Sequence, residues 1–572
     1  MSSYQPRTED MRFVLQNVLA APEALQALPA HAETDAELMQ QVLEEAGKFV
    51  GDVVAPLNRD GDEIGARWHD GKVTMPPGFK AAYQAFWQAG WPALSARSED
   101  GGQGLPAVLE AMLYEMLSAA NQGWTMAPGL LHGAYECIKH HASEALQAQY
   151  LSKVATGEWL ATMCLTEPHA GSDLGLARTR ATPLPDGRYA LSGTKIFISG
   201  GEHDLTDNIV HLVLARLPDA PPGPKGLSLF LVPKFYPDGS RSRVHCDRIE
   251  EKMGLHGSPT CVMRFDEAVS DIVGEPGKGL GAMFVMMNAA RLHVALQGIG
   301  LLDAAWQKAD AYSQERRQMR APGKGRSVGE ADLIGEHPAM RRILDTQRAW
   351  VDAGRVLAYQ TAIELDRVAH GDAALQAQAQ RWCALVTPVM KSVFTHQAFH
   401  GGSDCLQVFG GHGYVREWGI EQILRDARVA MIYEGTNEIQ AIDLLVRKVL
   451  ADGGQGLGGL LDQIEADLPA QARTRSAALA RIGTLRAVTQ QVVKAHALDP
   501  ALGFRVADDY LRAFALVLLD WAWLRIEAAV SADLPDRETR WLAPMRALRQ
   551  WVLPEFQMRT YIIVQQCTRE ST

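Results

Sequence analysis

The chain has 572 residues and a formal net charge of −11, with 47% hydrophobic and 22% charged residues. This length is too great for a single hydrophobic core, so we expect roughly three or four domains. The acidic balance argues against a chain-wide attraction to nucleic acid or to an anionic membrane, and the composition is that of an ordinary globular protein.

The seven cysteines are scattered along the chain without a C-x-x-C pair. This pattern favours reduced thiols over a disulfide framework or a zinc site, so no metal site is predicted. The first residues include Glu9 and Asp10 and lack the apolar segment of a secretory signal. No uncharged apolar stretch reaches the roughly 18 residues of a membrane span. We therefore expect a cytoplasmic protein without a stable membrane span.

Apolar residues recur at helical spacing near the N-terminus, as in Phe79, Tyr83, Phe86 and Trp87. The spacing predicts an α-helical domain over residues 1–160. From 161 to 280 the pattern changes to short apolar runs joined by glycine turns. Strands are expected at Tyr189–Ser199, Ile209–Arg216, Leu227–Val232 and Cys261–Phe265. No helical segment alternates with them, so an antiparallel β-barrel or sandwich is favoured over a parallel sheet.

Helical periodicity returns at Gly279 and predicts one long helix that could run to about Arg320. Further helices are expected at about 338–370, 373–400 and 403–410, which together form a helical bundle over residues 281–450. The glycine-rich stretch 453–459 is interpreted as a flexible joint. Residues 451–572 then form an additional helical domain, with 14 basic and 14 acidic residues.

One glycine pattern is interpreted as structural. Residues 277–282 imitate the G-x-G-x-x-A fingerprint of dinucleotide-binding folds. That fingerprint needs a second parallel strand within about 30 residues, whereas here the predicted helix simply continues. A turn at a domain border is the favoured interpretation.

Three segments are candidates for chemistry. The loop 166–173 is rich in small hydroxyl residues, and the strand 195–201 ends in an aromatic and a hydroxyl side chain. The third segment places Glu434 on a turn before Gly435, and Thr436 and Asn437 are suited to cap a new helix. Each alone is compatible with an ordinary loop, but a carboxylate on a turn can serve as a general base.

In this order, the three segments resemble motifs of the acyl-CoA dehydrogenase family. The resemblance extends to residues 407–414 (QVFGGHGY), 425–428 (RDAR) and 432–436 (IYEGT), and spans about residues 40–450. The C-terminal extension is similar to that of the subgroup with methylthiopropionyl-CoA dehydrogenases and broad-range fatty acyl-CoA dehydrogenases.

The resemblance implies an FAD cofactor between the middle β-domain and the C-terminal helices. The positions that match FAD contacts in the family are Met163, Thr166, Ser172, Phe197, Ser199, Arg316, Gln407, Gly410, Gly411, Thr436 and Glu438. Arg316 matches an arginine that reaches the FAD pyrophosphate of a neighbouring subunit. Glu438 is a departure, because several relatives have a neutral glutamine at that position.

The resemblance also implies the reaction, in which a base takes the α-proton of an acyl-CoA thioester and the β-hydrogen leaves as hydride to flavin N5. The family uses two positions for this base; one matches Glu434, and the other matches Ala290, which cannot act. Glu434 is therefore the predicted base, and Arg291 is expected to orient its turn. The predicted substrate-binding positions are Ser172, Asn288, Arg291, Tyr433 and Gly435.

Electron-transfer flavoprotein is the electron acceptor that the resemblance implies, and a homodimer is expected because the extension would cover a surface used for tetramers. Two alternatives stay open. One is an acyl-CoA oxidase that passes electrons to oxygen. The other is a non-catalytic, DNA-associated relative, which the charge-neutral extension disfavours. No motif indicates the acyl chain length.

Overall fold

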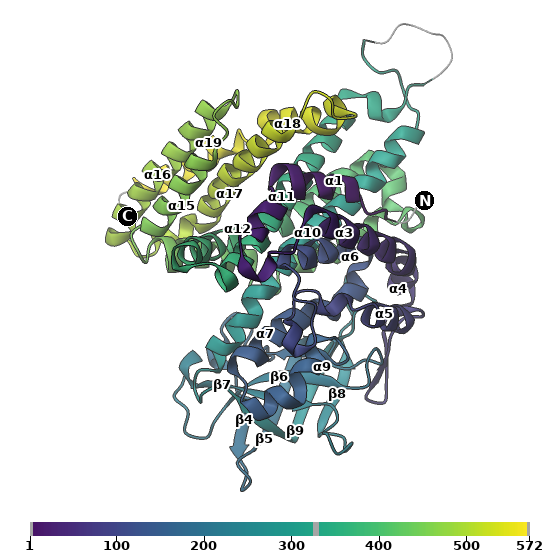
Figure 1. The fold of residues 1–572 in the computed structure, drawn as a ribbon, viewed down its shortest axis with the longest axis vertical. Coiled ribbons are helices and arrows are strands. Elements are labelled where there is room, and N and C mark those ends of the chain that lie inside the picture. The colour runs from purple at the N-terminus through teal and green to yellow at the C-terminus, as the bar shows by residue number, and fades with distance from the viewer. Residues whose placement is uncertain (1–3, 324–330, 569–572) are drawn as a thin grey trace. The chain divides into compact units, whose positions relative to one another are not determined.

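The computed structural model describes residues 4–323 and 331–568 and divides them between two compact units. Unit 1 comprises Met1–Gly47, Pro106–Ala119 and Val294–Thr572, and unit 2 comprises Lys48–Leu105 and Ala120–His293. Three helices continue across the borders: α3 (Ala36–Phe49), α6 (Ala107–Thr125) and α10 (Gly279–Glu315). Figure 1 labels many of the elements of both units.

Unit 2 combines short helices with a β-sheet. Its helices are α4 (Asn58–Ile64), α5 (Phe79–Gln88), α7 (Leu131–His141), α8 (Glu144–Leu146) and α9 (Ser152–Ala155). A small hairpin, β1 (Arg67–His69) and β2 (Lys72–Thr74), lies within the region for which only helices were predicted. These strands have three residues each and five of their six side chains are exposed, so they carry no apolar alternation.

The main sheet has the strands β3 (Leu160–Cys164), β4 (Arg180–Pro183), β5 (Tyr189–Ser199), β6 (Ile209–Arg216), β7 (Leu227–Pro233), β8 (Val244–Ile249) and β9 (Thr260–Val273). The four predicted strands are confirmed as β5, β6, β7 and part of β9. The prediction of a wholly antiparallel arrangement is wrong, because β6 pairs in parallel with β3 and, at one residue, with β4. The remaining pairings in this sheet are antiparallel.

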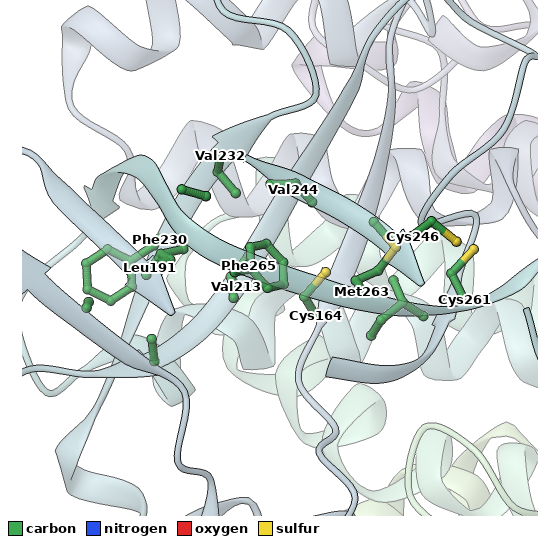
Figure 2. Close-up of a cluster of buried hydrophobic side chains, with 14 of the residues drawn as sticks. Cys164, Leu191, Val213, Phe230, Val232, Val244, Cys246, Cys261, Met263 and Phe265 are labelled. Carbon is green, nitrogen blue, oxygen red and sulfur yellow. The ribbon is translucent and has the colours of Figure 1, made fainter. Parts of the chain in front are cut away.

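The core of the sheet is apolar and contains several sulfur atoms (Figure 2). Phe230, Val213 and Cys164 come from adjacent strands and are fully buried, as are Leu191 and Cys261. Continuous burial along β3, β6 and β7 explains why their sequences are unbroken apolar runs instead of alternating ones.

Unit 1 is helical. Its remaining α-helices are α1 (Thr8–Phe13), α2 (Ala21–Gln26), α11 (Pro338–His370), α12 (Ala373–Val408), α13 (Ile420–Arg428), α14 (Asn437–Ile442), α15 (Gln455–Asp467), α16 (Arg475–Leu498), α17 (Leu502–Ala529), α18 (Ala543–Ala547) and α19 (Glu555–Cys567). α11 packs along α12, and α17 packs against α16 and α19 (Figure 1).

Three predicted helix borders in unit 1 are wrong. α12 runs through residues 401 and 402 without the predicted break, because these glycines allow close packing: a Cβ on Gly401 would lie 2.3 Å from Gln347 Oε1. α10 ends at Glu315, so Arg316 follows the helix instead of lying in it. Five of the seven residues of the predicted joint at 453–459 are helical, since α15 begins at Gln455.

α10 is long and apolar enough to cross a membrane by length and composition alone. However, 59% of its most apolar window is buried inside the protein. Such burial is typical of a helix in a protein core.

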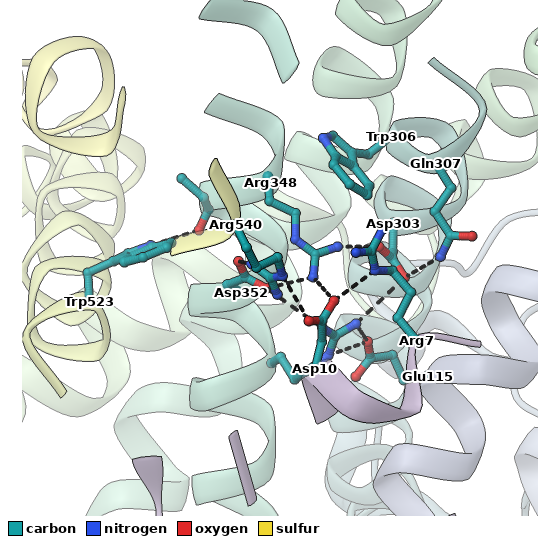
Figure 3. A network of polar contacts seen from close by, with 12 residues as sticks. Arg7, Asp10, Glu115, Asp303, Trp306, Gln307, Arg348, Asp352, Trp523 and Arg540 are labelled. Carbon is teal, nitrogen blue, oxygen red and sulfur yellow. Dashed lines mark hydrogen bonds and ion pairs between the residues drawn. The ribbon is translucent and has the colours of Figure 1, made fainter. Parts of the chain in front are cut away.

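A buried network of charges ties distant segments of unit 1 together (Figure 3). Arg348 on α11 donates to Asp10 on α1 at 2.6 Å and to Asp303 on α10 at 3.1 Å. Arg540, in the extension, donates to Asp352 at 2.7 Å and 2.9 Å and to Asp10 at 2.8 Å. The extension is thus joined to α1 and α11 by charge-assisted hydrogen bonds within one compact unit.

Candidate functional site

The turn that carries Glu434 lies between α13 and α14. Glu434 is half-buried and has a φ of 54°, and Gly435 follows with a φ of 83°. A left-handed conformation suits glycine but costs a residue with a Cβ atom about 1 kcal/mol or more, so the surroundings must hold Glu434 in place. The structure confirms the prediction that Glu434 lies on a turn.

The side chain of Gln440 is one group that holds this turn. Its Nε2 donates to the carbonyl oxygens of Glu434 at 3.1 Å and of Gly435 at 3.2 Å. Gln440 lies on α14 and is fully buried. The turn is therefore fastened to the helix that follows it.

Tyr433, just before the base candidate, is anchored to α10. Its hydroxyl donates to the side-chain oxygen of Gln297. Burial, with a further contribution from the Glu434 carboxylate, raises the pKa of Tyr433. The phenol therefore stays protonated and remains a hydrogen-bond donor at neutral pH.

Thr436 caps α14, as predicted. Its hydroxyl accepts a hydrogen bond from the Ile439 backbone N–H at 3.3 Å. Glu438 lies in the first turn of α14, and a hydrogen bond from Thr436 lowers the pKa of its carboxyl. A negative charge is favourable at a helix N-terminus, which gives Glu438 a structural role of its own.

Four predicted cofactor positions come together elsewhere in unit 1. Arg316, Gln407, Gly410 and Gly411 all line one cavity of about 540 Å³. A Cβ built on either glycine would meet no atom within 4 Å, so the backbone here faces open space. The cavity is therefore lined by the Arg316 guanidinium, the Gln407 carboxamide and the open backbone of two adjacent glycines.

The same cavity has an aromatic wall that the sequence analysis missed. Tyr312 stacks on Phe409 with ring centroids 4.4 Å apart, and its hydroxyl lies 2.9 Å from Nδ1 of His412. Phe409 and His412 belong to the same QVFGGHGY motif as Gln407. Their closeness in sequence to a predicted cofactor position was the signal that could have identified them.

The predicted flavin contacts of unit 2 lie on two neighbouring segments. Met163 is buried in β3, Thr166 and Ser172 follow in the next loop, and Phe197 and Ser199 lie at the end of β5. The Ile196 backbone N–H donates to the Thr166 carbonyl oxygen at 2.9 Å. The structure therefore places the loop beside the strand end.

Phe197 is presented to solvent by an irregularity in β5. The β5–β9 register shifts between Lys195 and Ile198, and Phe197 has a φ of 61°. The side chain is 60% exposed, which is unusual for phenylalanine. An exposed aromatic face beside hydroxyl groups is a surface on which a planar heterocycle can stack.

A buried ion pair, also missed, fixes these two segments to each other. Lys195 Nζ lies 2.9 Å from both Glu167 Oε1 and the Leu165 carbonyl oxygen. Glu167 also accepts hydrogen bonds from the Thr179 N–H and hydroxyl, at 3.0 Å and 2.6 Å. Burial alone would raise the pKa of Glu167, but Lys195 and Thr179 lower it to about 2.

The predicted residues of α10 belong to unit 2. Arg291 is 6% exposed and Ala290 is 8% exposed. The side chain of Asn288 lies outside the part of the chain that the structure describes. Glu434 belongs to unit 1, so the expectation that Arg291 orients its turn stays a prediction.

The residues present fit an FAD molecule. The exposed ring of Phe197 and the hydroxyls of Thr166 and Ser199 suit a planar, hydrogen-bonding ring system. Arg316 and the open backbone at Gly410 and Gly411 suit phosphate groups, which approach closely where no Cβ intervenes.

Family models match most of the chain. The N-terminal, middle and C-terminal domains of acyl-CoA dehydrogenase match residues 36–158, 162–268 and 277–449. The chain is 43% identical to 3-methylmercaptopropionyl-CoA dehydrogenase of Ruegeria pomeroyi over 469 residues, covering 81% of this chain and 79% of the relative. It therefore belongs to the acyl-CoA dehydrogenase family, a family of FAD-dependent oxidoreductases that dehydrogenate acyl-CoA.

Two further matches extend into the C-terminal helices. A broad-specificity linear acyl-CoA dehydrogenase of Mycobacterium tuberculosis is 34% identical and covers 89% of this chain and 84% of the relative. The fold resembles that of an acyl-CoA dehydrogenase complexed with FAD from Bacillus anthracis, with a TM-score of 0.76 at 20% identity. That match covers 97% of this chain and 92% of the other.

Proposed function

We propose that the protein converts an acyl-CoA thioester to the trans-2-enoyl-CoA, with Glu434 as the base. The observation that carries this proposal is the turn at Glu434, where a glutamate is held in a left-handed backbone conformation by bonds to its own carbonyl group and to the next one. Strained geometry of this kind is concentrated at functional sites. Ala290 matches the other position that the family uses for the base, and alanine cannot accept a proton. Of these two positions, Glu434 is therefore the one that carries a base.

In this reaction the protein itself supplies a general base held in a fixed position. The α-proton of a thioester is weakly acidic, so its removal needs a carboxylate held within reach of it. Glu434 takes this proton, and the β-hydrogen leaves with its electron pair. Gln440 and the Tyr433 hydroxyl keep the turn fixed while the proton is transferred.

Bound FAD supplies the hydride acceptor at flavin N5. The ring system would be held by Met163, Thr166, Ser172, Phe197 and Ser199. Gln407, Gly410 and Gly411, which line one cavity with Arg316, would hold the adenosine portion. By the family pattern, Arg316 would reach the pyrophosphate of a neighbouring subunit's FAD. Thr436 and Glu438 are the remaining proposed FAD contacts.

The thioester would be bound by Ser172, Asn288, Arg291, Tyr433 and Gly435. Arg291 would orient the turn at Glu434, as the family pattern implies. The relatives are named for methylmercaptopropionyl and linear acyl groups, and we propose a substrate of one of these two kinds. A panel of acyl-CoA lengths that includes the methylthio compound identifies it.

We also propose four domains with borders near residues 160, 280 and 450, a β-barrel in the second and a homodimeric assembly. The strand pairings support the barrel, because they return from β9 through β7 to β6. The three family-model matches support the first three domains.

The base assignment is tested with Glu434→Gln, which keeps the side-chain shape but cannot accept the proton. We expect FAD-bound protein with normal flavin absorbance that acyl-CoA no longer bleaches under anaerobic conditions. Glu417→Gln, at an exposed glutamate upstream, is the control and should bleach normally. Bleaching of the Glu434 variant at the wild-type rate would show that another group is the base.

Electron-transfer flavoprotein is the proposed acceptor of the electrons. The oxidase alternative gives a different product, because reduced flavin then reacts with oxygen. Peroxide formed in step with enoyl-CoA in the absence of electron-transfer flavoprotein would favour the oxidase. Tight binding to duplex DNA at physiological salt would favour the DNA-associated alternative.

A further inference from the structure

Lys391 is a fully buried lysine on α12. Its Nζ donates to the Gly435 carbonyl oxygen at 2.7 Å and to the Asn437 side-chain oxygen at 3.1 Å. Gly435 directly follows Glu434 in the chain. A buried ammonium therefore contacts the turn that carries the proposed base from a helix 44 residues away in sequence.

The side chain of Asn437 is itself fixed in one orientation. Its oxygen also accepts from the Thr395 hydroxyl at 3.2 Å, and its Nδ2 donates to the Ser392 carbonyl oxygen at 3.1 Å. Thr395 and Ser392 lie on α12 beside Lys391. One face of α12 thus forms a rigid cradle, made of Lys391, Ser392 and Thr395, for the start of α14.

The hydrogen-bond acceptors of the turn do not by themselves require a charged side chain at Lys391. The Gly435 carbonyl oxygen already accepts from Gln440 at 3.2 Å, and the Asn437 oxygen already accepts from Thr395. Removing an ammonium from water is unfavourable, so an uncharged residue would be the simpler choice for a filled, satisfied site. The positive charge is therefore expected to act on its surroundings.

We infer that Lys391 is a positioning residue for proton removal, a role that rests on the proposed function of Glu434. It holds the carbonyl group next to Glu434, and so fixes the direction in which the carboxylate leaves the turn. Its charge also favours a negative charge on the turn, which the base carries before it takes the proton.

The charge of Lys391 also acts on Glu438, the next acidic residue after Glu434. A hydrogen bond from Thr436 is the main cause that lowers the pKa of Glu438, and Lys391 lowers it further. The charge of Lys391 therefore acts on a residue in the first turn of α14.

The test uses the FAD-loaded protein with Lys391→Met and Lys391→Gln. Methionine removes the charge and the donor, whereas glutamine removes the charge but keeps an N–H donor on a slightly shorter side chain. We expect saturating acyl-CoA to bleach the flavin roughly 10- to 100-fold more slowly in both variants, because misplacing a reacting group costs about this much. FAD content, flavin absorbance and the KM for acyl-CoA should stay close to those of the wild type.

Lys448→Met is the matched control, because Lys448 also donates to a carbonyl oxygen of α12, that of Ala384. It should bleach at the wild-type rate. If Lys391→Met does not fold, Lys391→Gln carries the test. Wild-type bleaching in a folded variant overturns the inference, and so does loss of FAD or a raised KM with an unchanged bleaching rate, since those effects indicate structural support alone.

The Glu434→Gln variant separates this inference from the function on which it rests. If Glu434→Gln bleaches normally, the proposed base is wrong and the positioning role is overturned with it. If Glu434→Gln is inactive while both Lys391 variants bleach normally, only the positioning role is overturned.

Discussion

At the scale of single residues, buried charges do much of the positioning in this protein. Glu167 and Lys195 are nearly inaccessible to water, yet they join the two segments that carry the proposed flavin contacts. Lys391 does the same for the turn at Glu434. Each of these side chains makes at least two hydrogen bonds, and such bonds are the condition under which a buried charge is tolerated.

The Glu167–Lys195 pair gives stability a defined pH dependence. The folded-state pKa of Glu167, about 2, lies below its ordinary value of 4.5. The pair therefore stabilises the fold above about pH 4.5, and this contribution is lost as the pH falls towards 2. We expect the free energy of unfolding to be lower in Glu167→Gln than in the wild type, with a difference that shrinks by about 2 kcal/mol between about pH 7 and pH 3.

Denaturant unfolding of both proteins at the two pH values measures this effect. Glu158→Gln is the control, because Glu158 pairs with Lys153 at a half-exposed site of the same unit. It should change the unfolding free energy by less than about 1 kcal/mol at either pH. A Glu167 difference that stays constant or grows as the pH falls would contradict the account.

Sequence reasoning found the candidate base but missed the contacts of two buried lysines, Lys195 and Lys391. Glu434 could be predicted because the turn, the glycine and the helix cap are adjacent in the chain. Lys195 and Lys391 act on groups 28 and 44 residues away. A lone lysine in a predicted strand or helix is ordinarily exposed, so only the packed structure reveals its partner.

At the scale of elements, apolar patterns predicted β5, β6 and α11 with their observed bounds. The errors have local physical causes. Gly401 and Gly402 looked like a helix break, but both lie inside α12, where Gly401 permits close approach of Gln347. The parallel pairing of β3 with β6 could not be predicted, because a short apolar run carries no information about the direction of its neighbour.

Arg540 is one of the residues that attach the extension to α1 and α11. Arg540→Ala would leave Asp352, which is fully buried, without its two strongest hydrogen bonds. Breaking a buried charge network in this way costs about 3–5 kcal/mol of unfolding free energy. Urea denaturation of the variant and the wild type measures the loss.

Arg546→Ala provides the comparison, since Arg546 forms an exposed ion pair with Glu538 in the same segment. It should cost less than about 1 kcal/mol. Equal effects of the two substitutions would show that the buried network does not attach the extension.

At the scale of the whole molecule, the proposed fourth domain packs within the helical unit. Residues 451–572 fall into the same compact unit as α11 and α12, and Trp523 of α17 donates to the Ala349 carbonyl oxygen of α11 at 2.9 Å. The sequence showed that the extension was helical and charge-neutral. It could not show this attachment, because Arg540 and Asp352 are 188 residues apart.

The most direct test of the central claim is a single anaerobic turnover. The FAD-loaded protein is mixed with excess acyl-CoA of several chain lengths, and flavin absorbance and the acyl products are followed together. We predict that the flavin bleaches as one equivalent of trans-2-enoyl-CoA forms per FAD, for at least one chain length. Fully loaded protein that leaves every acyl-CoA unchanged and its flavin oxidised would contradict the account.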